Sequence, residues 1–560
     1  MSKITGGQLV VKALKQEGVN CVFALCGGHI DPIMQGCLNE KVRLVDARHE
    51  QAAVFMADGW ARVTGQPGVA LVTAGPGVTN TITSLWSASE CFSPIIVFGG
   101  RSILSEFEMG SLQDMDTLTL VDSVTKWRRG VYQTRRIPEY VSMAFRQALS
   151  GRQGPVYLEI PWDILRGEVE EEEVPLPTGY RTKARAQGDP TMVKKAVDLL
   201  LSAKRPIAIA GSGVKWSGAG KELQELIELI KLPVTLGQMG RGAVPDDHPL
   251  CCGPTRVGTR EADVVLIVGT RLNFQLAYGR SPLFAEEAKF IQIDIEPTEI
   301  GHNRPIDVGI CGDAKAVLKQ MIDEARDRCK GRKELPWVAE CRDYLKGRRE
   351  QLELNMNSDI MPMHPARMCK EISEFLDKDA TIVMDGADIT LWANTIFRAN
   401  QPDHWFDNAP TGCLGLGTGF AIAAKIARPD KQVFLLNGDG AFGFNSMEFD
   451  TMVRHNIPVV CVVGNDGGWG QIKQGQVARG GKVFATELGY VRYDKMVEGL
   501  GGYGEFVEEP EDIKPALKRA FASGLPACIN VKCAGVGGPS RRGRPELSKT
   551  AAKPADAKSR

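Results

Sequence analysis

The residue types of a metal and phosphate site occur at two places in the last third of the sequence. Gly438-Asp439-Gly440 follows the apolar run KQVFLLN, and Asn465-Asp466 follows the apolar run IPVVCVVG. Glycine lets a backbone approach a ligand closely, and the free N–H groups at the start of the helix expected after Gly440 can bind phosphate. Ligands of open α/β sheets bind at the carboxyl ends of the strands. Carboxylate and amide oxygens on two neighbouring strand ends suit Mg²⁺, which is often shared with phosphates.

This order of strand, GDG turn, second strand and N-D pair resembles the metal–diphosphate signature of thiamine diphosphate (ThDP) enzymes. The resemblance implies that Asp439, the side chain at the second N-D position and the backbone carbonyl of Gly468 bind Mg²⁺. The family commonly has two asparagines where this chain has Asn465 and Asp466, so the choice of ligand between them stays open. GCLGLGTGFAIAAKIA (412–427) matches the family's aminopyrimidine loop. The implied cofactor contacts are Gly412, Leu414, Gly438, Asp439, Gly440, Ala441, Asn465, Asp466 and Gly468.

VDARHEQAAVFMADGWARVTG (45–65) supplies the carboxylate that a ThDP enzyme needs. In this family an acid in an R-H-E context hydrogen-bonds the aminopyrimidine ring, and the cofactor supplies the electron sink. Glu50 fits this place, although the helix dipole alone also favours glutamate at a helix start. The resemblance places the cofactor between the first domain of one subunit and the third domain of its partner. We therefore expect Glu50 and Asp439 to meet across the interface of a homodimer or homotetramer.

Two polar residues near the start of the chain match the active-site histidine and glutamine of benzaldehyde lyase. His29 lies in ALCGGHIDPIMQGC (24–37), and Gln113 lies in MGSLQD (109–114). Histidine titrates near neutrality and glutamine both donates and accepts, so the pair suits proton relay to a substrate hydroxyl. Glu487, just after the expected metal loop, is a third candidate to face the substrate. Each of the three also fits a purely structural role.

The middle of the chain is similar to 2-hydroxyacyl-CoA lyase, and the related oxalyl-CoA decarboxylase has the same type of domain. The similarity rests on MGRGAVPDDHP (239–249), GTRLNFQLAYG (269–279) and FIQIDIEPTEIGHN (290–303). Relatives use this domain to hold ADP, FAD or the nucleotide of CoA, or leave it empty, and these alternatives stay open. The residues at its expected strand ends that would hold a nucleotide are Gly211, Ser212, Gly213, Arg271, Asp294 and Asp313.

The C-terminal tail, 537–560, is basic and interrupted by glycine and proline. Arg541, Arg542 and Arg544 would pair with the phosphates of CoA if the tail folded over the substrate, and a solvated tail is the alternative. The sequence predicts a 2-hydroxyacyl-CoA lyase, which reversibly cleaves the C1–C2 bond of a 2-hydroxyacyl-CoA to formyl-CoA and an aldehyde or ketone. The alternatives are a CoA-independent benzaldehyde-lyase-like or acetolactate-synthase-like carboligase, oxalyl-CoA decarboxylase, and a non-catalytic ThDP or nucleotide sensor.

Alternating apolar strands and amphipathic helices position these residues. Strand–glycine–helix units such as VALVTAGPG (69–77) indicate parallel sheets with helices on both faces. At roughly 150 residues per domain, 560 residues exceed one hydrophobic core. We predict an α/β protein of three doubly wound parallel-sheet domains. The predicted divisions are a pyrimidine-binding (PYR) domain at 1–167, a linker at 168–190, a middle domain at 191–335, a helical linker at 336–363, a diphosphate-binding (PP) domain at 364–536 and the tail at 537–560.

The bulk composition fits a soluble globular protein, with 43% hydrophobic and 24% charged residues. Lys plus Arg and Asp plus Glu both number 68, so no net charge draws nucleic acid or an anionic membrane. The N-terminus opens on an amphipathic helix pattern rather than a signal peptide, and no apolar run approaches the ~20 residues of a membrane span. The 14 cysteines are scattered without a CxxC pair, which predicts reduced thiols and a cytoplasmic protein.

Overall fold

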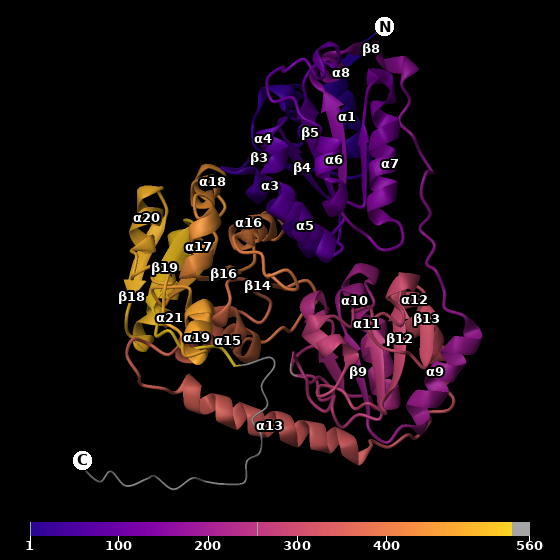
Figure 1. Ribbon diagram of the computed structural model, residues 1–560, viewed down its shortest axis with the longest axis vertical. Coiled ribbons are helices and arrows are strands. Elements are labelled where there is room, and N and C mark those ends of the chain that lie inside the picture. Colours follow the sequence, from indigo (N-terminus) through magenta and orange to yellow (C-terminus); the bar gives the residue numbers. More distant parts are fainter. Residues whose placement is uncertain (1, 255, 540–560) are drawn as a thin grey trace.

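The computed structural model describes residues 2–254 and 256–539, which form three α/β units that follow one another along the chain (Figure 1). Each unit is built on its own parallel sheet with helices around it. In Figure 1 the N-terminal unit lies at the top, the middle unit at lower right and the C-terminal unit at left. This confirms the predicted α/β class with three parallel-sheet domains, while the residue boundaries between the domains remain predictions.

The N-terminal (PYR) unit has a six-stranded parallel sheet in the order β3-β2-β4-β5-β7-β6. Alternate residues of a strand point to opposite faces, and both faces are buried, because Phe23 and its neighbour Val22 belong to two different core clusters. The strands are β2 (Cys21–Ala24), β3 (Arg43–Asp46), β4 (Gly68–Val72), β5 (Ile95–Arg101), β6 (Trp127–Gly130) and β7 (Val156–Pro161). The helices are α1 (Gly6–Gln16), α2 (Asp31–Asn39), α3 (Glu50–Thr64), α4 (Pro76–Thr79), α5 (Ile82–Glu90), α6 (Thr117–Leu120), α7 (Ile137–Leu149) and α8 (Trp162–Arg166).

The segment predicted as a linker, 168–190, begins with a strand. β8 (Glu168–Glu170) pairs antiparallel with β1 (Lys3–Thr5) at the start of the chain. Val174 is buried in the N-terminal core and Tyr180 packs against it. Backbone hydrogen bonds and apolar contacts therefore tie the first part of this segment to the PYR unit.

The middle unit has a five-stranded parallel sheet in the order β10-β9-β11-β12-β13. Its strands are β9 (Pro206–Ala210), β10 (Val234–Leu236), β11 (Val264–Val268), β12 (Lys289–Asp294) and β13 (Val308–Cys311), and its helices are α9 (Pro190–Ser202), α10 (Ser212–Ser217), α11 (Gly220–Ile230) and α12 (Ala314–Ala325). α13 (Pro336–Met356) then crosses from this unit to the C-terminal unit (Figure 1). Only Trp337, Val338 and Cys341 of α13 are buried, so most of this helix faces solvent.

The C-terminal (PP) unit has a six-stranded parallel sheet in the order β15-β14-β16-β17-β19-β18. Its strands are β14 (Thr381–Asp385), β15 (Trp405–Phe406), β16 (Val433–Gly438), β17 (Val460–Asn465), β18 (Tyr503–Val507) and β19 (Ala527–Lys532). Its helices are α14 (Pro365–Phe375), α15 (Asp388–Ile396), α16 (Leu416–Ala427), α17 (Asp439–Asn445), α18 (Glu448–Arg454), α19 (Gly470–Ala478), α20 (Tyr493–Gly499) and α21 (Ile513–Ser523). β16 and β17 are hydrogen-bonded neighbours, which brings the GDG and N-D signals to the same edge. Within the described ranges, no helix combines the length and the apolarity that crossing a bilayer requires.

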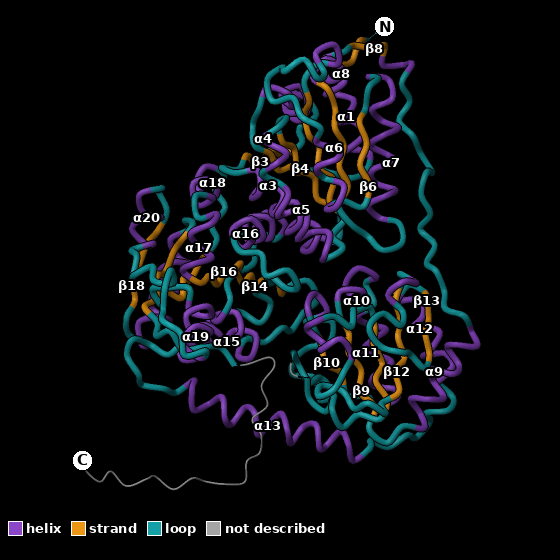
Figure 2. The backbone as a smooth tube through the Cα atoms, viewed as in Figure 1, coloured by secondary structure: helices purple, strands orange, loops and turns teal. Residues whose placement is uncertain are grey.

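Helices α3 and α16 join the PYR and PP units, and they lie against each other at the centre of the molecule (Figure 2). Small residues permit the close approach, because a Cβ at Gly59 would lie 2.8 Å from the Cα of Phe420. Asp58 and Arg62 form a buried ion pair, with 2.7 Å between a carboxylate oxygen and a guanidinium nitrogen. The guanidinium of Arg62 also lies 4.6 Å from the centre of the Phe420 ring. This packing fixes the helix that starts at Glu50 against the PP unit of the same chain.

Candidate active site

Asp439 and Asp466 form a pair of carboxyl groups at the carboxyl ends of β16 and β17. One oxygen of Asp439 accepts the backbone N–H of Gly468 at 2.9 Å, and the other accepts the N–H of Gly440 at 2.8 Å. Burial, together with the neighbouring charge of Asp466, holds the pKa of Asp439 above its usual range. Burial also raises the pKa of Asp466. Two carboxyl groups that repel each other in a buried position provide a natural place for a cation.

The side chain of Asn465 points away from this pair. Its amide N–H₂ donates to the backbone oxygen of Val491 at 3.0 Å and to the side chain of Asn530 at 3.1 Å. Its amide oxygen accepts the N–H of Gly467 at 3.1 Å. Every polar atom of this buried amide is therefore engaged in holding the loop after β17. Of the two candidates at the N-D position, Asp466 is the one beside Asp439.

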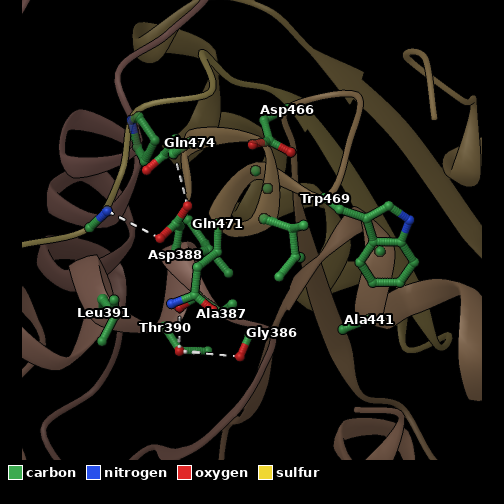
Figure 3. A pocket seen from close by; sticks show the side chains of 18 of the residues that line it. Gly386, Ala387, Asp388, Thr390, Leu391, Ala441, Asp466, Trp469, Gln471 and Gln474 are labelled. Carbon is green, nitrogen blue, oxygen red and sulfur yellow. Dashed lines mark hydrogen bonds between the residues drawn. The ribbon is translucent and has the colours of Figure 1, made fainter. Parts of the chain in front are cut away.

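A cavity of about 820 Å³ opens above these strand ends (Figure 3). It is lined by eight of the predicted cofactor contacts, which are Gly412, Leu414, Gly438, Asp439, Gly440, Ala441, Asp466 and Gly468. The middle unit contributes a second wall with Arg256, Phe274 and Gln275. Trp469 lies over the turn, since a Cβ at Gly440 would come within 2.6 Å of its ring. The cavity therefore joins the predicted diphosphate site to residues of another domain.

Asp388 is a cavity residue that the sequence analysis missed. It begins α15, accepts the side-chain N–H of Gln474 at 3.0 Å and accepts the backbone N–H of Gly538 at 3.4 Å (Figure 3). Burial raises its pKa. The signal was present in the sequence, because TIVMDGAD is a strand that ends in glycine and is followed by an acid, as in the GDG turn.

Asp385 holds the loop that carries Gly412 and Leu414. This fully buried residue ends β14, and one of its oxygens accepts the N–H groups of Gly415 at 2.8 Å and Gly417 at 2.9 Å. Burial raises its pKa to about 7. These hydrogen bonds from the end of β14 hold the turn at the start of α16. The half-buried Leu414 in this turn lies at the cavity wall.

The predicted residues of the PYR unit gather at the carboxyl edge of its sheet. The carboxylate of Glu50, at the start of α3, accepts the side-chain N–H of Asn80 at 2.9 Å. His29 Nδ1 lies 3.2 Å from the hydroxyl of Thr73, and burial lowers the pKa of this histidine. Gln113 packs across the glycine turn after β4, where a Cβ at Gly75 would meet its backbone oxygen at 2.8 Å.

Within one chain these two groups of residues form separate half-sites. Glu50, His29 and Gln113 do not line the cavity of the PP unit among the described residues. The start of α3 faces α17 and α18 instead, since Gln51 accepts the amide N–H of Asn445 at 3.1 Å. Within one chain, the PYR-unit candidates and the cavity of the PP unit therefore lie apart.

Two other predicted site residues form ion pairs, and three more are not described. Glu487 is 65% exposed, lies outside the cavity lining and pairs with Lys473 at 2.8 Å. Arg271 pairs with Glu90 of the PYR unit at 2.9 Å. Arg541, Arg542 and Arg544 lie outside the described residues.

The remaining middle-domain candidates lie at strand and helix ends. Asp313 caps α12 through the N–H of Ala316 at 3.1 Å. Ser212 donates to Gln238 at 3.0 Å, and Gly211 and Gly213 flank it in the turn after β9. Asp294 ends β12, and burial raises its pKa to about 6.

The residues around Asp439 fit a divalent cation that is shared with phosphate oxygens. Mg²⁺ prefers six hard oxygen ligands, and Asp439 and Asp466 supply two carboxyl groups. No group of three or more His, Cys, Asp or Glu side chains with metal-binding geometry occurs in the described part of the chain. The other ligands would then be backbone oxygens, water and the oxygens of a bound phosphate.

Three family models match the chain in the order of its three units. They are "Thiamine pyrophosphate enzyme, N-terminal TPP binding domain" over residues 4–120, "central domain" over 193–321 and "C-terminal TPP binding domain" over 385–531. "Probable acetolactate synthase" of Mycobacterium bovis is 39% identical over 530 residues, which cover 94% of this chain and 95% of the relative. "2-hydroxyacyl-CoA lyase 2" of Homo sapiens is 34% identical over 574 residues, with 94% and 89% covered. "2-hydroxyacyl-CoA lyase" of Arabidopsis thaliana is 31% identical over 547 residues, with 94% and 95% covered.

Proposed function

Because this chain belongs to the thiamine pyrophosphate enzyme family, we propose that it is a ThDP- and Mg²⁺-dependent 2-hydroxyacyl-CoA lyase. The family makes it a ThDP-dependent enzyme that acts on a small-molecule substrate. The proposed reaction cleaves the C1–C2 bond of a 2-hydroxyacyl-CoA to formyl-CoA and an aldehyde or ketone. In the reverse direction the enzyme joins formyl-CoA to a carbonyl compound.

The residues of the two half-sites have complementary tasks in this reaction. When bound, ThDP supplies the nucleophilic carbon and the electron sink. Asp439, Asp466 and the backbone of Gly468 would hold Mg²⁺, and Leu414 would support the cofactor from the cavity wall. Glu50, supplied by a second copy of the chain, would be the carboxylate that exchanges a proton with the aminopyrimidine. In the tautomer whose Nδ1–H donates to the hydroxyl of Thr73, Nε2 of His29 is the nitrogen that takes the proton of the substrate 2-hydroxyl, and the lowered pKa keeps the imidazole neutral.

The choice of a CoA ester as substrate rests on the position of residues 536–538 at the rim of the cavity. Val536 and Gly538 line the cavity, and the N–H of Gly538 contacts Asp388. The basic stretch begins directly afterwards in the sequence. Arg541 follows Gly538 by three residues in the sequence. Arginine pairs well with phosphate, so the covalent tether supports a role of the tail in binding the phosphates of CoA.

The test is to incubate the enzyme, ThDP and Mg²⁺ with glycolyl-CoA or 2-hydroxyisobutyryl-CoA and to measure formyl-CoA. A deletion of 540–560 should raise the KM for the CoA ester about tenfold or more, because several charge-assisted hydrogen bonds are lost. A triple substitution of Arg541, Arg542 and Arg544 to Lys is the matched control, since it keeps the charge and loses only the bidentate geometry. Absence of formyl-CoA with every hydroxyacyl-CoA, alongside condensation of pyruvate, would sink the proposal.

An acetolactate-synthase-like carboligase is the second candidate. Arg256 on the middle-domain wall is the cationic side chain among the described lining residues of the cavity, and a 2-keto acid needs such a group for its carboxylate. The relative from Mycobacterium bovis, at 39% identity, also favours it. Under this alternative, Arg256→Gln should abolish pyruvate condensation, while the deletion of 540–560 should leave it unchanged. Under the proposed function, the deletion has the larger effect.

Mixing two inactive variants tests whether each active site is shared between two subunits. Glu50→Gln and Asp439→Ala inactivate different half-sites, so each variant alone should be inactive. When the two variants are mixed and allowed to exchange subunits, a hybrid dimer contains one site with both residues intact. Recovery of activity on mixing supports sites shared between subunits. Two inactive variants that stay inactive after proven subunit exchange would show that each site is built within one chain.

We also propose ADP as a ligand of the middle unit, at the turn formed by Gly211, Ser212 and Gly213 near Asp294. These residues lie at the carboxyl edge of a parallel sheet, where such folds bind ligands. Calorimetric titration with ADP tests this. Asp294→Ala should weaken binding, whereas Asp189→Ala, which removes the cap of α9, should lower only stability.

A further inference from the structure

The loop that carries Gln113 is anchored at its ends and exposed at its tip. It runs from the end of β5 to α6, over residues 102–116. Met109 and Leu112 at the tip are 75% and 77% exposed. Gln113 itself has a φ of +61°, a left-handed conformation that is uncommon outside glycine. Such a conformation persists when the surrounding contacts determine it.

Asp114 provides those contacts on the C-terminal side of Gln113. One of its oxygens accepts Arg101 Nε at 3.1 Å and the hydroxyl of Ser102 at 3.0 Å. The other accepts the backbone N–H of Glu108 at 2.9 Å. Burial alone would raise the pKa of Asp114, but the hydrogen bonds from Glu108, Ser102 and Arg101 hold it below the usual range. One ionised side chain thus ties together the start, the middle and the end of the loop.

Arg101 in turn is held by Glu159 of the neighbouring strand and by the ring of Phe107. Its Nη1 donates to both oxygens of Glu159 on β7, at 3.1 and 3.2 Å, and its guanidinium lies 4.2 Å from the centre of the Phe107 ring. The hydroxyl of Thr117 donates to the same Glu159. The side chains of Arg101 and Glu159 are 10% and 0% exposed. A buried charge network of this kind has few alternative arrangements.

On its other side, Gln113 lies against the glycine turn after β4. A Cβ at Gly75 would meet the backbone oxygen of Gln113 at 2.8 Å and its Cβ at 3.0 Å. Thr73, the hydrogen-bonding partner of His29, is two residues before Gly75. Gln113 is therefore held between Asp114 and the strand end that also orients His29.

We propose that Asp114 and Arg101 are positioning residues that hold the Gln113 side chain at the proton-relay site. The inference rests on the proposed role of Gln113 in the reaction. Neither charged residue is among the described residues that line the cavity, so they would act on catalysis through the placement of Gln113. A displacement of a catalytic group by about 1 Å costs about 100-fold in rate, so a loosened loop should be visible in kcat.

A double-mutant cycle between Asp114→Asn and Gln113→Ala tests this. Asp114→Asn keeps the side-chain shape and removes the charge that Arg101 requires. It should lower kcat about 10- to 100-fold with the Kd for ThDP unchanged, and in the Gln113→Ala background it should lower kcat by less than about twofold. Asp116→Asn is the matched control, because Asp116 lies at the end of the loop but its described hydrogen bonds go to Thr119 of α6 and not to Arg101, Ser102 or Glu108. It should leave kcat close to that of the parent.

Three outcomes overturn the inference. If Asp114→Asn lowers kcat by the same factor in both backgrounds, Asp114 does not act through Gln113. If Gln113→Ala retains the parent kcat, the proposed role of Gln113 fails and the inference fails with it. If Asp114→Asn retains the parent kcat while Gln113→Ala does not, only the positioning role is wrong. Arg101→Lys, which cannot reach Asp114 and Glu159 together, should reproduce the non-additivity.

Discussion

The two half-sites differ in how the protein treats their acidic groups. In the PYR unit, Asp114 and Glu159 are bridged by Arg101, and Glu50 is hydrogen-bonded by Asn80. Four acids at or beside the cavity of the PP unit have no such cationic partner in their described hydrogen bonds, which come from backbone N–H groups and Gln474. They are Asp385, Asp388, Asp439 and Asp466, and burial raises the pKa of each, as it does for Glu159 in the PYR unit.

This difference indicates which half is complete without a ligand. A buried acid paired with arginine is electrostatically satisfied within the chain. Buried acids that face one another gain stability when a divalent cation enters. The PYR half is therefore preorganised by its own side chains, whereas the cation proposed for the PP half would supply the charge that its acids lack. Substitutions on the two sides should then differ in whether they affect catalysis alone or cofactor binding as well.

The largest effect is expected for Glu50→Gln. Because the PYR half is preorganised, this change should remove the proton exchange without disturbing the surrounding structure. We expect kcat to fall about 100- to 10,000-fold while the Kd for ThDP, measured by calorimetry, stays within about threefold. Glu487→Gln is the control, since Glu487 is exposed and paired with Lys473. A comparable loss of kcat in the control would show that the activator was assigned to the wrong glutamate.

Asp439→Asn should behave differently, because it acts on the half that needs a cation. Removing one of two carboxylates should weaken Mg²⁺ binding about 100-fold, and ThDP binding should weaken with it. Much of the activity should return at high Mg²⁺ concentration. Titrating ThDP binding against Mg²⁺ measures the effect. Asp379→Asn is the comparison that should leave the metal affinity unchanged, because Asp379 pairs with Lys431 at 2.6 Å. The proposed metal site would be contradicted if the variant bound ThDP as tightly as the parent does and if this affinity did not depend on Mg²⁺.

The pattern of strands was sufficient to locate the edge of the PP site. Two apolar runs that end in polar signals predict neighbouring strand ends in a parallel sheet, and β16 and β17 are neighbours. The amphipathic pattern of residues 45–65 predicts a helix with Glu50 at its start, and α3 does begin there. Such features depend on local periodicity, which the sequence displays directly.

The contacts that decide side-chain direction come from distant segments, and local patterns do not contain them. Asn465 turns away from the site because its side-chain N–H₂ group donates to the backbone oxygen of Val491 and to the side-chain oxygen of Asn530 on β19. Glu487, expected to face a substrate, turns outward to Lys473 of α19. Asp388 becomes a cavity residue only because α19 and the segment at Gly538 fold against it.

A smaller effect is expected for Asp385→Asn, and it concerns pH. An acid whose pKa rises from 3.8 to about 7 on folding binds its proton more tightly in the native state, so the free energy of unfolding falls as the pH rises through this range. Asparagine keeps the acceptor for Gly415 and Gly417 and cannot ionise. Between about pH 5 and pH 7.5 the parent should lose on the order of 2 kcal/mol more than the variant, by urea denaturation. Identical pH dependences would mean that Asp385 does not titrate in this window.

The smallest effect is expected for Asp466→Asn, and its sign depends on the ligand. Without cofactor and metal, the substitution removes the repulsion between two buried carboxylates, so the free energy of unfolding should increase by about 1 kcal/mol. With Mg²⁺ and ThDP present, the variant should lose stabilisation relative to the parent, because it binds the cation less tightly. The control is Asp114→Asn in the PYR half, where removing a charge paired with Arg101 should lower the stability of the protein in both conditions. Thermal unfolding of parent and variants, with and without ligands, measures all four differences. If Asp466→Asn destabilised the ligand-free protein as Asp114→Asn does, both half-sites would be electrostatically complete by themselves, and the contrast between them would not hold.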